Sequence, residues 1–191
     1  MILRVLSRVT ELPVWAHLSA GVATLGFFQW VKGHLDASYA AAKHPVDYFT
    51  GQTTFSGPAV KGYYAQMLET GTLDVYWTTQ VIDYGFIFAI ICIGTFVATL
   101  FARISRKESV GRRIGLLGGA SLCLGAICDA IENAWSFLML ANPTDFPDWL
   151  ALPYSAFASV KFGFITLGMA LVLISLLCAV LGRVLGKPRI G

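Results

Sequence analysis

The stretch IGLLGGASLCLGAICDAIENAWSFLML, residues 114–140, decides the fold class of this chain. A helix that crosses a membrane needs about 20 consecutive, mostly apolar residues. This stretch is longer than that, and its only charged residues are Asp129 and Glu132. We therefore predict that it spans a membrane. The same criterion predicts three further spans, at about residues 13–31, 81–101 and 152–181.

The composition of the whole chain is typical of a membrane protein. Of its 191 residues, 56% are hydrophobic and 13% are charged, whereas a typical soluble domain has about 25% charged residues. The sequence therefore predicts an all-α integral membrane four-helix bundle, with residues 1–191 forming a single transmembrane domain. All four cysteines fall inside apolar runs without a CxxC pattern, so we expect neither structural disulfides nor a redox dithiol.

The positions of the basic residues predict the orientation of the chain. Cytoplasmic flanks of membrane spans carry an excess of Lys and Arg, and ten of the 14 such residues fall on one predicted side. These ten are Arg4, Arg8, Arg103, Arg106, Lys107, Arg112, Arg113, Arg183, Lys187 and Arg189. We therefore expect a multi-pass protein of a bacterial-type plasma (inner) membrane with both termini in the cytoplasm. The net charge of +3 then reflects topology, and we expect no nucleic-acid partner.

The predicted outer loop, residues 32–80, is long and rich in aromatic residues. Within it, Ser56 and Pro58 are typical of a helix start and Gly71 of a helix end, so the loop is predicted to carry a short amphipathic helix. We expect this helix to lie on the membrane surface or to cap the bundle. The loop aromatics are Tyr39, Tyr48, Phe49, Phe55, Tyr63, Tyr64, Tyr76 and Trp77, and we interpret them mainly as an interfacial belt.

Polar residues recur at helical spacing in the third predicted span. Asp129, Glu132, Asn133 and Ser136 lie at i, i+3, i+4 and i+7, which places them on one face of a helix. Small residues such as Gly125 continue this face, which allows a neighbouring helix to approach closely. We therefore expect the polar face to point into the bundle.

The fourth predicted span contains one cation, Lys161. A rise of 1.5 Å per residue places Lys161 about 15 Å from the outer end of its helix, and Asp129 and Glu132 about 16 and 12 Å from theirs. The two helices are joined by a short loop and are expected to be antiparallel neighbours. We therefore predict that Lys161 contacts Asp129 or Glu132. Asp83, near the outer end of the second span, adds a third carboxylate.

The charges in this layer do not balance. With Asp83, Asp129, Glu132 and Lys161 all ionised the net charge is −2, which is costly in a low dielectric unless the site takes up a proton or a cation. Paired acids of this kind suit general acid–base chemistry, so we assign these four residues as candidate catalytic groups. The alternative is that the ion pair only locks two helices together. Candidate ligand-binding residues are Asn133, Ser136, Trp135, Tyr154 and Phe157.

Other potential sites are weaker. His17 is interpreted mainly as a packing histidine in the first span. His34 and His44 lack ligand spacing to each other or to any cysteine, so we expect no metal site. No nucleotide-binding or hydrolase motif occurs, so no cofactor is expected.

Two families resemble parts of this sequence. At CDAIEN, residues 128–133, and SVKFGF, residues 159–164, the chain resembles bacterial four-helix integral membrane proteins of unassigned function, which have an acidic D-x-x-E-N stripe and one buried Lys. The layout, with Asp36 in a long aromatic loop and Asp83 heading the second span, is similar to the EXPERA group of emopamil-binding sterol isomerases and the sigma-2 receptor. That resemblance implies binding of sterols or amphiphilic amines in an acidic cavity, and it makes Asp36 a further candidate ligand-binding residue. The EXPERA group has no counterpart of Lys161 or of the set Asp129, Glu132 and Asn133.

The sequence leads us to expect a buried acidic site that binds or protonates a small hydrophobic or amphiphilic molecule, lipid-like or sterol-like. If the protein is an enzyme, acid–base chemistry of the isomerase or cyclase type on a hydrophobic substrate is expected. One alternative is a proton- or cation-coupled carrier, which would need a homodimer, and glycine-rich faces such as those at Gly115, Gly118, Gly119 and Gly125 make a dimer possible. The other is a structural or assembly subunit with helix-locking charges.

Overall fold

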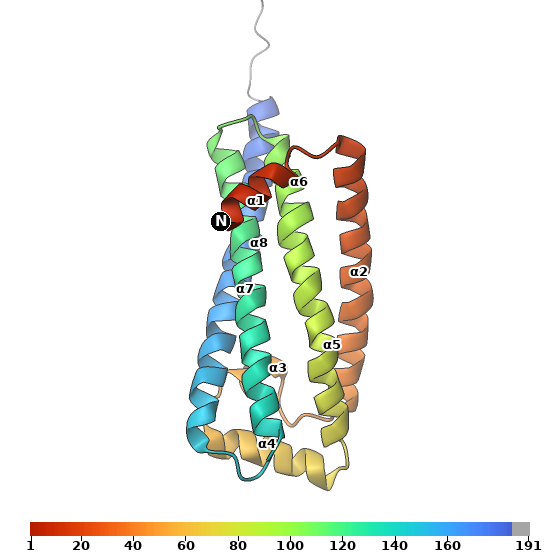
Figure 1. Ribbon diagram of the computed structural model, residues 1–191, viewed down its shortest axis with the longest axis vertical. Coiled ribbons are helices and arrows are strands. Elements are labelled where there is room, and N and C mark those ends of the chain that lie inside the picture. The colour runs from red at the N-terminus through yellow and green to blue at the C-terminus, as the bar shows by residue number, and fades with distance from the viewer. Residues whose placement is uncertain (185–191) are drawn as a thin grey trace, which may run out of the picture. The chain divides into compact units, whose positions relative to one another are not determined.

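The computed structural model describes residues 1–184, which are almost entirely helical and contain no strand (Figure 1). Two basic residues of the predicted cytoplasmic tail, Lys187 and Arg189, lie outside the described residues. The helices are α1 (Ile2–Val9), α2 (Val14–Ala41), α3 (Tyr48–Gln52), α4 (Gly57–Glu69), α5 (Leu73–Cys92), η1 (Ile93–Val97), α6 (Ala98–Ile104), α7 (Val110–Leu140), η2 (Asp148–Leu150) and α8 (Ala151–Val184).

Three helices are long and apolar enough to cross a membrane. Within residues 1–184 they cover Leu73–Ile104, Val110–Leu140 and Asp148–Gly182. The first of these is the continuous run of α5, η1 and α6. α2 is also long, at 28 residues, but polar residues such as His17 and Gln29 lower its hydropathy. Its crossing of the membrane stays a prediction.

The helices extend further than the apolar windows indicated. α2 continues to Ala41 and α5 begins at Leu73, so residues 32–41 and 73–80, predicted as outer loop, are helical. Backbone hydrogen bonding does not stop where hydrophobicity falls, and Lys32 and Asp36 form an i,i+4 ion pair on the extended part of α2. The connection between α2 and α5 is correspondingly shorter than predicted.

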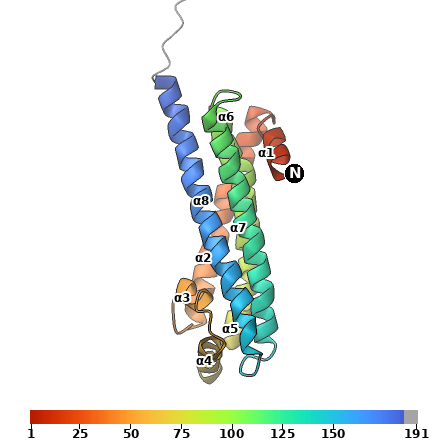
Figure 2. The same ribbon diagram turned by 90° about the vertical axis from the view of Figure 1, so that its left-hand side faces the viewer.

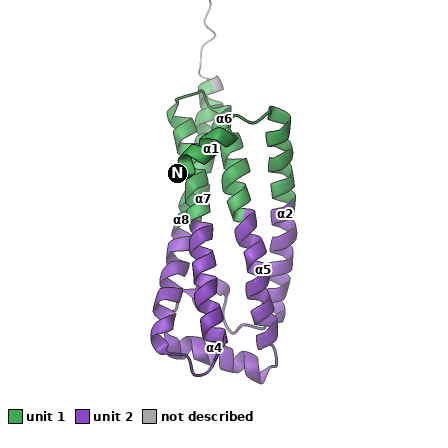
Figure 3. Cartoon of the chain, viewed as in Figure 1, with its two compact units in different colours: residues 1–26, 90–124, 164–191 green, residues 27–89, 125–163 purple. Residues whose placement is uncertain are grey.

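The chain forms two compact units, whose boundaries fall inside the long helices (Figure 3). Unit 1 contains residues 1–26, 90–124 and the part from 164 on, and unit 2 contains residues 27–89 and 125–163. All candidate catalytic and ligand-binding residues belong to unit 2.

Unit 1 is packed through glycines at close helix contacts. A Cβ atom added to Gly119 would lie 2.4 Å from the carbonyl oxygen of Gly94, and one added to Gly118 would lie 3.0 Å from that of Gly168. A Cβ atom on Gly115 would lie 2.5 Å from a serine hydroxyl of α8. Gly115, Gly118 and Gly119 therefore serve close packing between helices of their own chain.

A π-helical turn, η1, interrupts the regular hydrogen bonding of unit 1. The Nε2 atom of His17 lies 3.0 Å from the Phe96 carbonyl oxygen, in that turn, and 3.0 Å from the Thr99 hydroxyl. His17 is fully buried. A π-turn interrupts the regular backbone hydrogen bonds of an α-helix. His17 supplies polar contacts at this interruption. These contacts agree with a packing role for His17.

Unit 2 contains a buried core in which α4 packs against the ends of the long helices. Val60, Tyr64 and Met67 of α4 cluster with residues of α7 and α8 such as Met139 and Tyr154. In Figure 1 α4 runs across the lower ends of these helix segments, and in Figure 2 it is seen nearly end-on at the same end. α4 therefore covers one end of this unit.

Specific contacts fix the position of α4. The Ser56 hydroxyl accepts a hydrogen bond of 3.3 Å from the backbone N–H of Ala59, which caps the helix. A Cβ atom on Gly57 would lie 2.5 Å from the Cα atom of Asp148, so only glycine permits this approach. Asp148 also pairs with Lys61 at 2.7 Å. After α4, the chain turns at Gly71, whose φ of +66° favours glycine.

The short helix α3 packs along α8. The rings of Tyr48 and Phe49 lie 6.2 and 5.0 Å from the ring of Phe162. The backbone N–H of Phe55 donates a 3.0 Å hydrogen bond to the hydroxyl of Ser155, which is fully buried. These loop aromatics therefore contact a long helix, instead of forming only the predicted interfacial belt.

Candidate functional site

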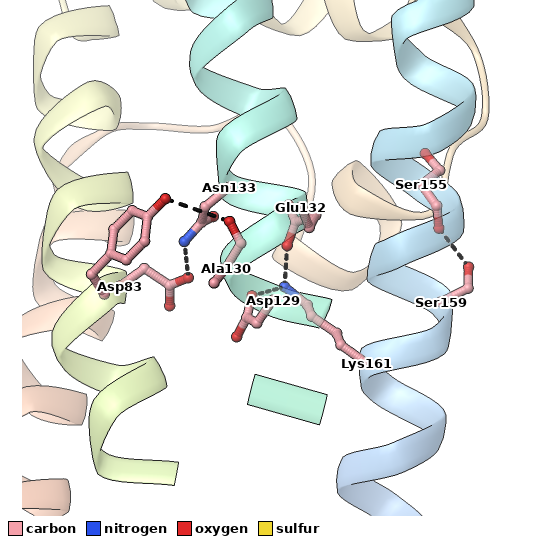
Figure 4. A network of polar contacts seen from close by, with 9 residues as sticks. Asp83, Asp129, Ala130, Glu132, Asn133, Ser155, Ser159 and Lys161 are labelled. Atoms are coloured by element: carbon pink, nitrogen blue, oxygen red, sulfur yellow. Dashed lines mark hydrogen bonds and ion pairs between the residues drawn. The ribbon is translucent and has the colours of Figure 1, made fainter. Parts of the chain in front are cut away.

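Lys161 bridges two buried carboxylates in unit 2. Its Nζ atom lies 2.6 Å from Oδ1 of Asp129 and also donates to Oε2 of Glu132 (Figure 4). The three side chains are 5%, 4% and 0% exposed. The predicted contact is confirmed, and Lys161 reaches both carboxylates instead of one.

Helix geometry explains why these groups meet. Asp129 and Glu132 are three residues apart on α7 and therefore share a face. Asp129 lies eleven residues before the end of α7, and Lys161 lies ten residues after the start of α8. A rise of 1.5 Å per residue gives about 16 and 15 Å along the two helices. Because the loop between α7 and α8 is short, these equal depths bring the charges together.

Asp83 is held by a different partner. Nδ2 of Asn133 donates a 2.7 Å hydrogen bond to Oδ2 of Asp83, which joins α5 to α7. Asp83 is partly exposed, unlike Asp129 and Glu132. Within the described residues it forms no ion pair with Lys161. The site therefore consists of a buried triad, with Asn133 linking α7 to a more accessible third carboxylate.

Four buried polar atoms beside this triad form no hydrogen bond to another group in the described part of the protein. They are Oε1 of Glu132, Oδ1 of Asn133, Oγ of Ser136 and the hydroxyl of Tyr64. The residues are 0%, 0%, 0% and 1% exposed. A buried polar group left without a partner costs about 1–3 kcal/mol. Four of them in one part of a fold are therefore a feature that needs an explanation.

Tyr64 reaches this polar region from α4. Its hydroxyl lies near that of Ser136, one turn along α7 from Glu132, but the two do not meet hydrogen-bond geometry. Burial raises the pKa of Tyr64 above its usual value, with the Ser136 hydroxyl acting against this shift and the charge of Glu132 adding to it. Tyr64 therefore keeps its proton at neutral pH and remains a hydrogen-bond donor.

Sequence reasoning did not identify Tyr64 as a site residue. It lies on the apolar face of α4 with Val60 and Met67, where a tyrosine has the same pattern as any core aromatic. Only the packing of α4 on α7 brings its hydroxyl to Ser136, and no spacing in the sequence indicates that contact.

The remaining predicted ligand-binding residues divide into two groups. Tyr154 is buried in the core cluster, Trp135 packs against that cluster, and Phe157 is partly buried on α8. Asp36 is exposed and pairs with Lys32 on its own helix. The structure therefore does not bring Asp36 to the site, because that side chain projects from the extended end of α2.

Comparison of the chain with known protein families, curated proteins and solved structures found no match. No group of three His, Cys, Asp or Glu side chains suited to a metal ion occurs in residues 1–184. The chemistry proposed for the site therefore depends on its own side chains alone.

The site offers charge, hydrogen-bond donors and hydrogen-bond acceptors in a buried layer. One oxygen of Glu132 is occupied by the Lys161 ammonium, while the other has no partner among the described residues. This leaves a positioned carboxylate oxygen that can accept a hydrogen bond or exchange a proton.

Proposed function

We propose that the protein is a membrane protein whose buried acidic site binds or protonates a small hydrophobic or amphiphilic molecule. The observation that carries this proposal is the unpartnered oxygen of Glu132, a residue that is 0% exposed and held in place by Lys161. A fixed carboxylate with one free oxygen is the arrangement that a general acid–base group or a ligand receptor requires.

The charge of the site supports this proposal. The buried triad of Asp129, Glu132 and Lys161 has a net charge of −1 when all three are ionised, and the partly exposed Asp83 brings the set to −2. Burial disfavours such an excess, and a proton or a cationic group would relieve it. If the protein is an enzyme, a carboxylic acid beside a carboxylate suits acid–base chemistry of the isomerase or cyclase type on a hydrophobic substrate.

We place the site in a four-span bundle in the plasma membrane, with both termini in the cytoplasm. α2 supplies the fourth span in this proposal. Its side chains Trp15, Val22 and Trp30 are 74%, 70% and 60% exposed, as lipid-facing residues are. Trp15 and Trp30 lie about 22 Å apart along the helix, a spacing that suits the two membrane interfaces. α4 then lies at the outer surface.

The alternative accounts explain less of the site. Helix locking accounts for the contacts of Lys161 with Asp129 and Glu132, but leaves the free oxygen of Glu132 and the Ser136 hydroxyl without a role. A dimeric carrier would need an interface elsewhere than the glycines at Gly115, Gly118 and Gly119, which pack within the chain.

The test compares the wild-type protein with Glu132→Gln, which keeps the shape of the side chain and removes its charge. The measurement is native mass spectrometry of protein purified from membranes, which detects bound small molecules. We expect a hydrophobic molecule bound to the wild type and lost in Glu132→Gln. The matched control is Glu69→Gln, on the exposed end of α4, which should retain the molecule. Equal binding by the wild type and Glu132→Gln would refute the proposal.

A further inference from the structure

The four unpartnered atoms of the site differ in what they offer a ligand. Nδ2 of Asn133 donates to Asp83, so its free Oδ1 is an acceptor. Oε1 of Glu132 is also an acceptor while the residue is ionised. The hydroxyls of Ser136 and Tyr64 can each donate and accept. A group that satisfies this set must therefore both donate and accept hydrogen bonds.

We propose that Glu132, Asn133, Ser136 and Tyr64 form a subsite for the hydroxyl group of a hydrophobic alcohol. This inference rests on the proposed function and specifies the polar group of its ligand. The alcohol O–H donates to the free oxygen of Glu132 or Asn133, and its oxygen accepts the hydrogen bond of Tyr64. The Ser136 hydroxyl can either donate a hydrogen bond to the alcohol or accept one from it.

Other polar groups fit the subsite less well. A carboxylate or phosphate would meet the excess negative charge of the layer and cannot donate to Glu132. A ketone accepts hydrogen bonds only, so it leaves the acceptors of Glu132 and Asn133 unfilled. An ammonium suits the net negative charge of the layer, but it only donates hydrogen bonds, so it cannot accept the proton of the Tyr64 hydroxyl.

The surroundings of the subsite suit an apolar chain. Tyr64 belongs to the buried hydrophobic cluster, together with Met67 of α4 and Met139 of α7. Met139 lies three residues after Ser136, on the same side of α7. The polar atoms therefore lie at the border of an apolar core, and the hydrocarbon chain of a bound alcohol would insert among these apolar side chains.

Water offers the same hydrogen bonds as an alcohol, and the experiment must separate the two. The probes are hexadecan-1-ol carrying a photoreactive diazirine in its chain, the methyl ether of this alcohol, and the corresponding primary amine. Each is cross-linked to the full-length wild-type protein in detergent micelles, and the labelled peptides are identified by mass spectrometry. We expect saturable labelling of α4 and α7 by the alcohol, at an affinity about tenfold or more above that of the ether.

Two variants test the named hydroxyls. Tyr64→Phe and Ser136→Ala should each weaken binding of the alcohol about tenfold and leave binding of the ether unchanged. Tyr63→Phe, which removes a hydroxyl from the neighbouring position on α4, is the matched control and should bind as the wild type does. Ser136→Ala removes only one atom, so it keeps the test open if Tyr64→Phe fails to fold.

The outcomes separate this inference from the proposed function. Equal binding of the alcohol and the ether would mean that the subsite recognises no ligand hydroxyl and holds water only, which overturns the inference. Tighter binding of the amine would also overturn it, while the acidic site would stand as a receptor for amphiphiles. Binding of all three probes that is unaffected by Glu132→Gln would overturn both.

Discussion

Lys161 is the residue on which the buried layer depends most. Replacing it with methionine leaves Asp129 and Glu132 buried without their cation, and breaking a buried pair in this way costs about 3–5 kcal/mol of folding stability. Because Lys161 contacts both acids, Lys161→Met with Asp129→Asn should restore only part of the loss. Adding Glu132→Gln should restore most of the remainder. The measurement is denaturant unfolding in detergent.

Lys61 gives this prediction a matched control. It pairs with Asp148 at 2.7 Å, but the two side chains are 27% and 59% exposed. Exposed ion pairs contribute about 0–1 kcal/mol. Lys61→Met should therefore cost far less stability than Lys161→Met. If the two variants lost equal stability, Lys161 would not be compensating buried charge.

His44 gives a prediction for the effect of pH. Burial lowers its pKa below the usual value, although the Val46 carbonyl and the charge of Asp47 act in the opposite direction. The unfolded chain then binds a proton more readily than the folded chain does. We expect stability to be greatest above about pH 6.5, the unfolded value, and to fall as the pH drops below it.

The matched variant for this prediction is His44→Gln. Its stability should change less between pH 7 and pH 5 than that of the wild type, because the residue with the lowered pKa has been removed. Thermal unfolding at each pH is the measurement. The aromatic rings of Tyr39, Tyr63 and Tyr76 surround His44. Both proteins should be compared in the same detergent. An identical pH profile would contradict this role of His44.

At the scale of helices, close glycine contacts should make unit 1 sensitive to a single methyl group. Gly119→Ala would place a Cβ atom 2.4 Å from the carbonyl oxygen of Gly94. Since backbone must move to accommodate it, we expect a loss of about 1–3 kcal/mol. Gly163→Ala is the control, because no atom lies within 4 Å of its added Cβ, and a helical alanine should stabilise the protein slightly. Similar effects of the two changes in unfolding experiments would refute the tight packing.

Helical periodicity made part of the site predictable. The spacing of Asp129, Glu132 and Asn133 was sufficient to place them on one face, and equal depth was sufficient to place Lys161 beside them. Asp36 was expected at the site only from the resemblance to the EXPERA group, and the structure places it instead on the exposed extension of α2, paired with Lys32. Tyr64 could not be found, since its contact depends on how α4 packs against α7.

The membrane orientation of the whole molecule is a prediction from its basic residues. The test introduces single cysteines, Lys107→Cys and Glu69→Cys, into a cysteine-free variant of the protein. Lys107 lies in the connection between α6 and α7, Glu69 lies at the end of α4, and both positions are exposed. A membrane-impermeant thiol reagent added to intact cells should label Glu69→Cys only. Labelling of Lys107→Cys instead would invert the orientation, and labelling of both would contradict the arrangement of spans.

The proposed function of the molecule requires a ligand at the free oxygen of Glu132. The most direct measurement is an experimental structure of the protein extracted with its native lipids, at a resolution that shows bound molecules. We predict elongated non-protein density within hydrogen-bond distance, about 3 Å, of Oε1 of Glu132 and of the Tyr64 hydroxyl. A closed, dry site in which these atoms pair only with protein groups would contradict the proposed ligand binding. The buried charges would then serve only to lock the helices together.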